Sequence, residues 1–303
     1  MPKVSVIIPN YNHARYLDQR IQSVLNQTYQ DFEVIILDDC STDNSLEVIN
    51  KYKDNPHISQ IVVNKVNSGS TFKQWDKGIH LAKGEIIWIA ESDDFCESIF
   101  LDEMMEQWSK NPQCAIIQSM CNTVDDMGYT LCDISGTCSG NARMLSGIEA
   151  IRKHLINDGF YIPNASAVTF RKDLAFEIPL EYTKFLSSGD RFFWIQMLEK
   201  GSIITVDKPL NNFRQHNKDK VSYSREKDGT QCRENYIINR YLHKKKYITG
   251  KLRDKELAHY WNYIHSFDFL NEDIRKELIH LWFPGIKRFY LIYRIRRKLY
   301  SLS

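Results

Sequence analysis

The chain has 303 residues, 43% of them hydrophobic, so it is long enough to bury a core in one large domain or two smaller ones. Forty Lys and Arg residues against 38 Asp and Glu leave a net charge of +2, and we expect no nucleic-acid partner because no overall field would attract one. Seven cysteines without a C-x-x-C pair argue against a disulfide framework and a zinc site, and favour reduced thiols in a cytoplasm.

Apolar runs of strand length alternate with helical patterns through the first 120 residues, which indicates an α/β fold. The first run starts without the features of a signal peptide, and no run approaches the ~18 apolar residues of a membrane span. Strands are predicted at 4–8, 33–37, 58–63, 85–90 and 115–120, with helices at 72–82 and 98–109 among those between them. Because the runs are continuous rather than alternating, we expect strands covered on both faces, as in a largely parallel sheet.

The pattern loosens from about 121 to 162, before a helix predicted around 146–157. Beyond about 226 the sequence is charged and helical, has no proline until Pro284, and is rich in Tyr and Trp. We therefore predict a boundary near 225 that separates an α/β body, 1–225, from an α-helical C-terminal region, 226–303.

Polar clusters follow three of the predicted strands. They are "PNYN" (9–12), "DDCSTDNS" (38–45) and "ESDD" (91–94). In an open α/β sheet, ligands bind outside the carboxyl ends of the strands, so we expect these clusters to converge at one edge. Helix capping is the alternative role for each acid or serine. Two adjacent Asp pairs exceed what capping needs.

The pair Asp93-Asp94 predicts a site for a hard divalent cation, Mn²⁺ or Mg²⁺. Such a cation is often held by one or two carboxylates, while water and substrate phosphates fill its other positions. A diphosphate would fit that arrangement. The chain has no Walker-type motif, so its phosphates are not expected to be cradled as in P-loop enzymes.

Five segments in this order carry a resemblance: "VSVIIPNYNHARYL", "QTYQDFEVIILDDCSTDNS", "NSGS", "KGEIIWIAESDD" and "SSGDRFFW". The chain resembles a family 2 glycosyltransferase of the GT-A fold through most of 1–222. The resemblance implies a nucleotide-binding half, 1–120, and an acceptor-side half, 121–225. It also implies an inverting, metal-assisted transfer of a sugar from a nucleotide-diphosphate donor, UDP being the favoured nucleotide, onto a growing glycan.

The same resemblance implies roles for residues after the first two strands. In the segment that begins with Pro9, Tyr11 would stack on the donor base. Asp39 would accept a hydrogen bond from the base ring, with Asp38 beside it. Pro9, Tyr11, Asp38 and Asp39 are therefore expected to bind the donor.

Asp93 and Asp94 match the DXD-type element that the family places near the diphosphate and the metal. Glu91 stands where many members have Asp, and whether it touches the ribose stays open. Many members also carry an arginine after the "NSG" segment, and this chain does not. Whether Lys73 or Lys77 supplies that positive charge stays open as well.

Asp190 matches the catalytic base of the family, and the chemistry requires such a group, because the acceptor hydroxyl must lose its proton as it attacks. The alternative is that Asp190 caps the helix that it begins. His216 resembles a late motif in which a His reaches the metal or the diphosphate, with Arg214 nearby on the donor. A lone His is, however, more often an ordinary core or surface residue.

The acceptor is expected to be a saccharide or a lipid-linked saccharide. Asn164 and Ser166 would either bond its hydroxyls or satisfy loop backbone. The segment 281–303 has no acid and alternates cations with apolar and aromatic residues. It would either lie in an anionic membrane interface, at the inner face of the membrane, or pack on the body with a solvated basic edge.

Two other classes of protein compete with this interpretation. A sugar nucleotidyltransferase would also hold a metal with carboxylates on an α/β sheet, but those enzymes resemble one another in a Gly-rich, basic loop after the first strand, and "PNYNHARYLDQ" has no glycine. A catalytically inactive nucleotide-sugar-binding protein would have no need of all of Asp39, Asp93, Asp94 and Asp190. Release of pyrophosphate would support the first competitor, and turnover of the donor would exclude the second.

Overall fold

The computed structural model describes residues 1–152, 162, 164–215, 221–266 and 270–284. It divides into two compact units, Met1–Asn217 and Lys218–Ser303, so the division falls before the boundary predicted near 225. Each unit is described by itself.

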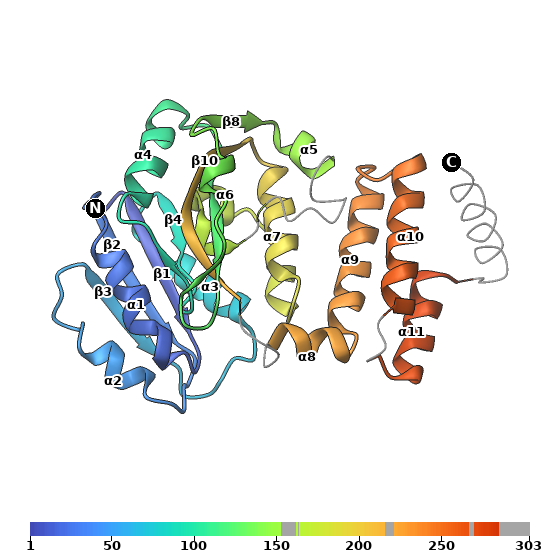
Figure 1. Ribbon diagram of the computed structural model, residues 1–303, viewed down its shortest axis with the longest axis horizontal. Helices are drawn as coiled ribbons and strands as arrows, with labels where there is room; N and C mark the ends of the chain where they lie inside the picture. The colour runs from blue at the N-terminus through green and yellow to red at the C-terminus, as the bar shows by residue number, and fades with distance from the viewer. Residues whose placement is uncertain (153–161, 163, 216–220, 267–269, 285–303) are drawn as a thin grey trace. The chain divides into compact units, whose positions relative to one another are not determined.

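The first unit is built around one mixed sheet (Figure 1). Its elements are β1 (Val4–Asn10), α1 (Ala14–Leu25), β2 (Phe32–Asp38), α2 (Ser45–Asn50), β3 (Ile58–Val63), α3 (Thr71–Leu81), β4 (Ile86–Ile89), β5 (Phe95–Cys96), α4 (Phe100–Lys110), β6 (Ile116–Val124), β7 (Thr130–Cys132), β8 (Ala142–Leu145), α5 (Gly147–Ala150), β9 (Val168–Arg171), α6 (Lys172–Ala175), α7 (Gly189–Leu198) and β10 (Ile203–Arg214). The strand order is β3-β2-β1-β4-β9-β6-β10-β5, with β7 beside β6 and β8 beside β10.

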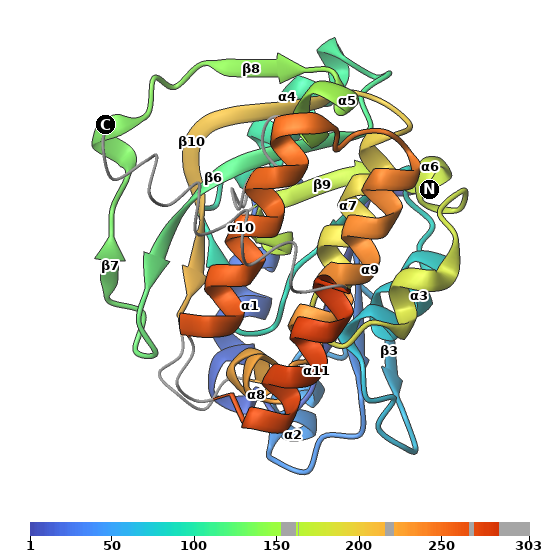
Figure 2. The same cartoon turned by 90° about the vertical axis from the view of Figure 1, so that its right-hand side faces the viewer.

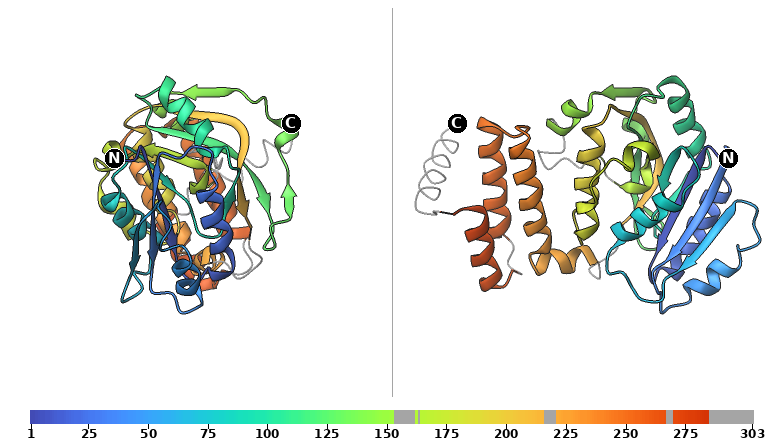
Figure 3. Two further views of the ribbon diagram at one scale, coloured as in Figure 1. Left: turned by 90° about the vertical axis from the view of Figure 1, so that its left-hand side faces the viewer. Right: turned by 180° about the vertical axis from the view of Figure 1, so that it is seen from behind.

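The parallel sheet predicted from the continuous apolar runs is found in the N-terminal half. There β3, β2, β1 and β4 are parallel neighbours, drawn in blue to teal in Figures 1 and 3. Beyond β4 the sheet is mixed, because β9 runs antiparallel to both β4 and β6. The short strands β7 and β8, which sequence periodicity did not predict, are largely exposed and pair antiparallel with β6 and β10.

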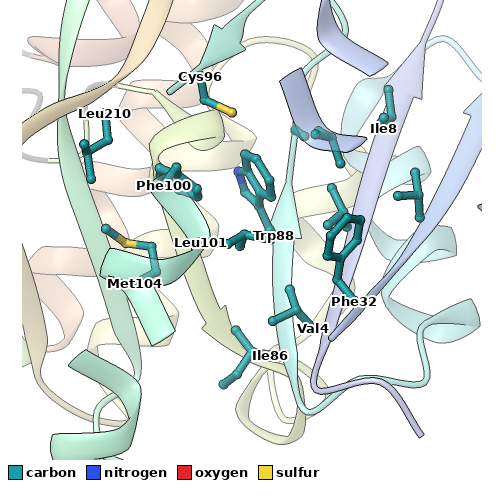
Figure 4. Packing of buried hydrophobic residues seen from close by; sticks show 14 of the residues in the cluster. Val4, Ile8, Phe32, Ile86, Trp88, Cys96, Phe100, Leu101, Met104 and Leu210 are labelled. Atoms are coloured by element: carbon teal, nitrogen blue, oxygen red, sulfur yellow. The ribbon is translucent and has the colours of Figure 1, made fainter. Parts of the chain in front are cut away.

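The two faces of the N-terminal strands are buried under different helices. One face carries Val6, Ile8 and Trp88 into a core shared with α1, α2 and α4. Figure 4 shows Trp88 beside Phe100 of α4, and their rings stack with centroids 4.5 Å apart. On the other face α3 comes so close to β1 that a Cβ at Gly78 would lie 2.4 Å from Ile7 Cγ2. Burial on both faces explains why these strands read as unbroken apolar runs.

The second unit is helical in its described part, as expected for the C-terminal region. It contains α8 (Val221–Lys227), α9 (Thr230–Lys244), α10 (Gly250–Ser266) and α11 (Glu272–Trp282), and α11 contacts both α9 and α10 (Figure 2). Its core consists of Cys232, Tyr260, Trp261, Ile264, Leu270, Leu278, Trp282 and Phe283. Within the described residues, no helix has the length and apolar character needed to cross a membrane. Most of the predicted membrane-contact segment, from 285 onward, lies outside the described residues.

Candidate active site

The three polar clusters leave the sheet at one edge. The register pairs Asn10 at the end of β1 with Asp38 at the end of β2, and Ile7 with Ile89 at the end of β4. The amide of Ala90 then donates to the carbonyl of Ile7 across 2.8 Å. The loops that follow these strands therefore start beside one another, as the parallel arrangement predicts.

The loops after β1 and β2 are locked to each other by side chains. Asn12 Oδ1 accepts the amide of Thr42 across 2.7 Å, and the amide of Asn12 donates to Ser41 Oγ across 2.9 Å. Asn12 and Cys40 both adopt left-handed backbone, at φ 56° and 64°. Residues other than glycine are uncommon there and such geometry is held by its surroundings, so the cross-links between the loops are what keep this edge in shape.

Pro9, Asp38 and Tyr11, all expected to bind the donor, differ in exposure. Pro9 is buried within β1. Asp38 is fully buried, and its carboxylate accepts from Asn10 Nδ2 across 2.8 Å and from the amide of Ser41 across 2.9 Å. Tyr11, by contrast, is 45% exposed, which leaves a ring face open to a stacking partner. Pro9 and Asp38 thus shape the edge, while Tyr11 faces outward from it.

Asp39 joins three elements at this edge. It is 5% exposed, and its carboxylate accepts from Asn64 Nδ2 across 2.6 Å, from Ser68 Oγ across 2.7 Å and from Gln74 Nε2 across 2.9 Å. These donors come from the end of β3, the following loop and α3. The amide of Ser68 also donates to both oxygens. This carboxylate therefore fixes the loop where the family motif "NSG" lies.

Lys73 and Lys77, left open as partners of a diphosphate, hold the same loop. Lys73 Nζ donates to the carbonyl of Ser68 across 2.8 Å, and Lys77 Nζ to Asn64 Oδ1 across 2.5 Å. Both ammonium groups are thus engaged by loop oxygens in this structure.

Within "ESDD", Asp94 is buried and already provided with hydrogen-bond donors. Its Oδ1 accepts the amide of Arg214 across 2.9 Å, and its Oδ2 accepts Ser166 Oγ across 2.7 Å and Asn164 Nδ2 across 2.8 Å. Only 1% of Asp94 is exposed, whereas Asp93 is partly exposed. Asn164 and Ser166 were considered as partners of acceptor hydroxyls. In this structure both donate side-chain hydrogen bonds to Asp94.

The first acid of the motif, Glu91, accepts a hydrogen bond from a tryptophan. Glu91 Oε1 accepts the indole N–H of Trp75 across 2.7 Å. Burial, together with the nearby charge of Asp93, raises the pKa of Glu91 to about 8. The same two causes raise the pKa of Asp94 to about 6. At pH 7 Glu91 therefore keeps most of its proton, whereas Asp94 has lost most of its own.

A buried arginine partly offsets these acids, and sequence reasoning did not single it out. Arg20 is fully buried, donates from Nε to the carbonyl of Glu91 across 2.8 Å, and places Nη2 3.9 Å from Asp94 Oδ2. It lowers the pKa of both carboxyl groups. The signal was available, because Arg20 lies on the apolar face of α1 among Leu17, Ile21 and Val24, where a cation is expensive unless paired.

Arg214, predicted to lie on the donor, has a different place in this structure. Its guanidinium donates to the carbonyls of Asp93, Asp125 and Asp126 across 2.7, 3.0 and 2.9 Å, and to Gln19 Oε1 across 2.7 Å. The residue is 2% exposed. Through these bonds Arg214 braces the "ESDD" loop, and its contact with the donor stays a prediction. His216 lies outside the described residues.

Asp190 lies in the first turn of α7 and is partly exposed. The helix start is pressed against α3, since a Cβ at Gly189 would lie 2.5 Å from Phe72 Cδ2. Ser188 is the N-cap residue and makes no capping hydrogen bond with its side chain, while Asp190 Oδ1 accepts the amide of Arg191 across 2.7 Å. Ser188 rather than Asp190 is therefore the N-cap residue, but the Asp190 carboxylate does accept one of the free amides of the first turn. Its role as the base stays a prediction.

Trp75 connects the acidic loop with the helix that carries Asp190. It is 1% exposed, its indole N–H reaches Glu91, and its ring lies 5.7 Å from that of Trp194 and 6.0 Å from that of Phe193 in α7. It is thus a packing residue of α3, and it contacts both parts of the site.

A divalent cation fits this edge at one carboxylate. Within the described ranges, no three His, Cys, Asp or Glu side chains are grouped so as to hold a metal ion by themselves. Mg²⁺ and Mn²⁺ do not need such a cage when substrate phosphates complete the coordination. Asp93 is the more exposed member of the Asp pair, so the arrangement suits a cation shared with a bound diphosphate.

Comparisons with known proteins agree with this geometry. A family model for glycosyl transferase family 2 matches residues 5–175, more than half of the chain. A Haemophilus influenzae protein described as an uncharacterized glycosyltransferase is 35% identical over 136 residues, which are 45% of this chain and 50% of that protein. The poly(ribitol-phosphate) beta-glucosyltransferase of Bacillus spizizenii is 26% identical over 287 residues, 88% of this chain and 44% of that protein. The chain spans half or less of the length of either relative.

Among solved structures, S. aureus TarS 1-349 in complex with UDP-GlcNAc matches with a TM-score of 0.62. The match covers 98% of this chain and 92% of that one, at 17% sequence identity, and so shows a shared fold. The predicted GT-A type of α/β fold is confirmed. From the family model and the fold together, the chain belongs to glycosyl transferase family 2.

Proposed function

We propose that the chain transfers a sugar, with inversion, from a UDP-sugar to a saccharide or lipid-linked saccharide in surface polysaccharide synthesis, and that it requires Mn²⁺ or Mg²⁺. The observation that carries the proposal is the joining of two regions far apart in sequence. Trp75 supports both the "ESDD" loop after β4 and the start of α7 with Asp190. A group that holds a diphosphate and a group that removes a proton are what this transfer needs.

The donor is assigned to the edge formed by β1, β2 and β4. The exposed Tyr11 supplies a face for the base, and Asp39 holds the loop beside it. TarS structures with UDP and with UDP-GlcNAc support a uridine donor for the same fold. The Bacillus spizizenii relative, whose substrate is poly(ribitol-phosphate), supports a polymeric glycan as acceptor.

We assign the metal contact to Asp93 and a structural role to Asp94. Asp94 has three donors on its two oxygens and is buried, so binding a cation would require breaking those hydrogen bonds. Asp93 is partly exposed, and the guanidinium of Arg214 holds its carbonyl in place. His216 stays a proposed further ligand.

In the transfer step, Asp190 accepts the proton of the acceptor hydroxyl while that oxygen attacks the anomeric carbon from the side opposite the diphosphate. The chemistry supplied by the divalent cation, when it is bound, is neutralisation of charge on the leaving diphosphate. Phe72 and Trp75 pack against the N-terminal part of α7 and so help to fix the position of Asp190. This matters because the rate that a catalytic base can support depends on its position.

All seven cysteines are free, and we place the reaction in the cytoplasm, at the inner face of the membrane.

Calorimetric titration with UDP, GDP and dTDP, with and without Mn²⁺, tests the donor site. We expect UDP to bind best, in a Mn²⁺-dependent way that Asp93→Asn weakens and Asp190→Asn does not. No nucleotide binding under any condition would refute the assignment of the edge. Product analysis then separates the reactions, since UDP release supports transfer and pyrophosphate release supports a nucleotidyltransferase.

A further inference from the structure

The helical unit contains a pocket that the proposed reaction does not use. It has a volume of about 720 Å³ and lies within 236–284. Its lining includes Tyr236, Arg240, His243 and Lys244 of α9, Arg253 of α10 and Trp282 of α11. We call it the helical pocket. Cations and aromatic rings thus meet in one concave place.

The cations of the helical pocket have no carboxylate partners in the part of the chain that the structure describes. Arg240, Lys244 and Arg253 are all exposed, and none of them forms an ion pair there. Other arginines of the same unit behave differently, and Arg233 pairs with Glu277 at 2.7 Å.

Arg253 also stands where a helix disfavours a cation. It lies in the first turn of α10, a turn without any acidic residue. The aligned peptide dipoles give a helix N-terminus a partial positive charge, so a cation there is repelled and an anion is attracted. Nearby, burial and the charge of Arg253 lower the pKa of His243. Among the residues that line the pocket, three are Lys or Arg and none is acidic, so the lining carries a net positive charge.

The aromatic lining distinguishes the helical pocket from a simple basic patch. Tyr236 is half-buried, with the guanidinium of Arg240 5.9 Å from its ring centroid. Its ring packs edge-on against that of the buried Trp282, 5.3 Å away. Asn239, which also lines the pocket, donates its side-chain amide to the buried carboxylate of Glu256. Such a surface offers an apolar face to C–H groups beside cations for anionic groups.

We propose that the helical pocket binds a phosphodiester-containing glycan chain, the acceptor polymer of the transfer. Arginine forks match phosphate oxygens in pairs, and tyrosine faces match the carbon backbone between phosphates. A polymer chain can enter a recessed pocket. A protein that binds a flat membrane surface would instead be expected to place its cations on a protruding surface. The inference rests on the proposed function and adds the chemical class of the acceptor and a place that retains it.

The test is calorimetric titration of the full chain with a short ribitol-phosphate oligomer. A neutral malto-oligosaccharide, a hyaluronan oligomer and phosphatidylglycerol vesicles serve as competing ligands. The test variant is Arg240→Gln/Arg253→Gln. Its matched control, Lys255→Gln/Lys276→Gln, removes two exposed charges of the same unit that do not line the pocket. UDP titration of each sample reports on the donor site separately.

We expect the ribitol-phosphate oligomer to bind in preference to the other three ligands. The test variant should weaken that binding about tenfold or more, as loss of charge-assisted hydrogen bonds implies, and the control less than about twofold. Bound oligomer should also move the pKa of His243, followed by NMR, back up towards its ordinary value.

Several results would overturn the inference. Equal losses in test and control variants would mean that only overall charge matters. Stronger binding to vesicles would assign the pocket to a membrane, and equal binding of hyaluronan would remove the preference for phosphate. UDP binding without oligomer binding would refute the helical pocket alone, and binding of neither would refute the proposed function as well.

Discussion

Replacing Glu91 by Gln should stabilise the protein at neutral pH, although it removes a carboxyl group from the candidate active site. The pKa of Glu91 rises from its ordinary value of 4.5 to about 8 on folding, mainly because the side chain is withdrawn from water. An acid with a raised pKa favours the folded state only at low pH. Its contribution is intact below pH 4.5 and is lost as pH rises towards 8, because the unfolded chain gives up the proton first.

The size of the effect follows from that difference in pKa. At pH 5 the cost of keeping Glu91 protonated is about 1 kcal/mol, and at pH 7 it is about 3 kcal/mol. Glutamine has no proton to lose, and its amide oxygen still accepts the indole N–H of Trp75. For a unit of this size, the pH 7 value corresponds to a rise in Tm of about 10 °C.

The assay is thermal unfolding of wild type and Glu91→Gln from pH 5 to pH 8 in the presence of a chelator. The chelator matters because a cation at Asp93 would lower the pKa of its neighbour. Glu181→Gln, at an exposed position, is the control and should change stability by less than about 0.5 kcal/mol. A Glu91→Gln variant that is no more stable than wild type, or whose advantage does not grow with pH, would show that Glu91 ionises normally.

Three further predictions concern the same site. Asp190→Asn should keep UDP binding and lose about 10²–10⁴-fold in turnover, measured as UDP release; near-normal transfer would remove Asp190 from the role of base. Asp94→Asn should lower the free energy of unfolding by about 2–4 kcal/mol, while Asp93→Asn should leave it nearly unchanged and abolish the Mn²⁺-dependent part of UDP binding; the reverse pattern in urea titrations would exchange their roles. Trp75→Phe, which loses the hydrogen bond to Glu91 and part of the α3 packing, should cost about 1–3 kcal/mol, and an unchanged urea midpoint would contradict it.

Sequence periodicity was sufficient for the elements that have strong apolar patterns. The runs at β1, β2 and β4 and the helix α3 were predicted within a few residues, and parallel pairing then required their ends to meet. It failed for β7 and β8, because both are largely exposed edge strands and carry no alternating apolar signal. It also overestimated parallel pairing, since nothing in the sequence of β9 sets its direction.

The division of labour within "ESDD" was beyond sequence reasoning for a different reason. The groups that donate hydrogen bonds to Asp94 belong to Asn164, Ser166 and Arg214, which are at least 70 residues away along the chain. No local pattern announces such partners, so Asp93 and Asp94 looked equivalent. Arg20 was different, because a cation within an apolar helical stripe is visible in the sequence itself.

The position of Trp75 has a consequence for attempts to change which nucleotide the protein accepts. The loop that Asp39 holds and the helix that supports the start of α7 are consecutive in the chain, from 64 to 81. Exchanging that stretch for another family member's would change the loop held by Asp39 and the packing of α3 against α7 at the same time. On the proposed roles, we therefore expect changes at 64–81 to affect both the donor edge and Asp190, so such an exchange should include the matching residues of α7.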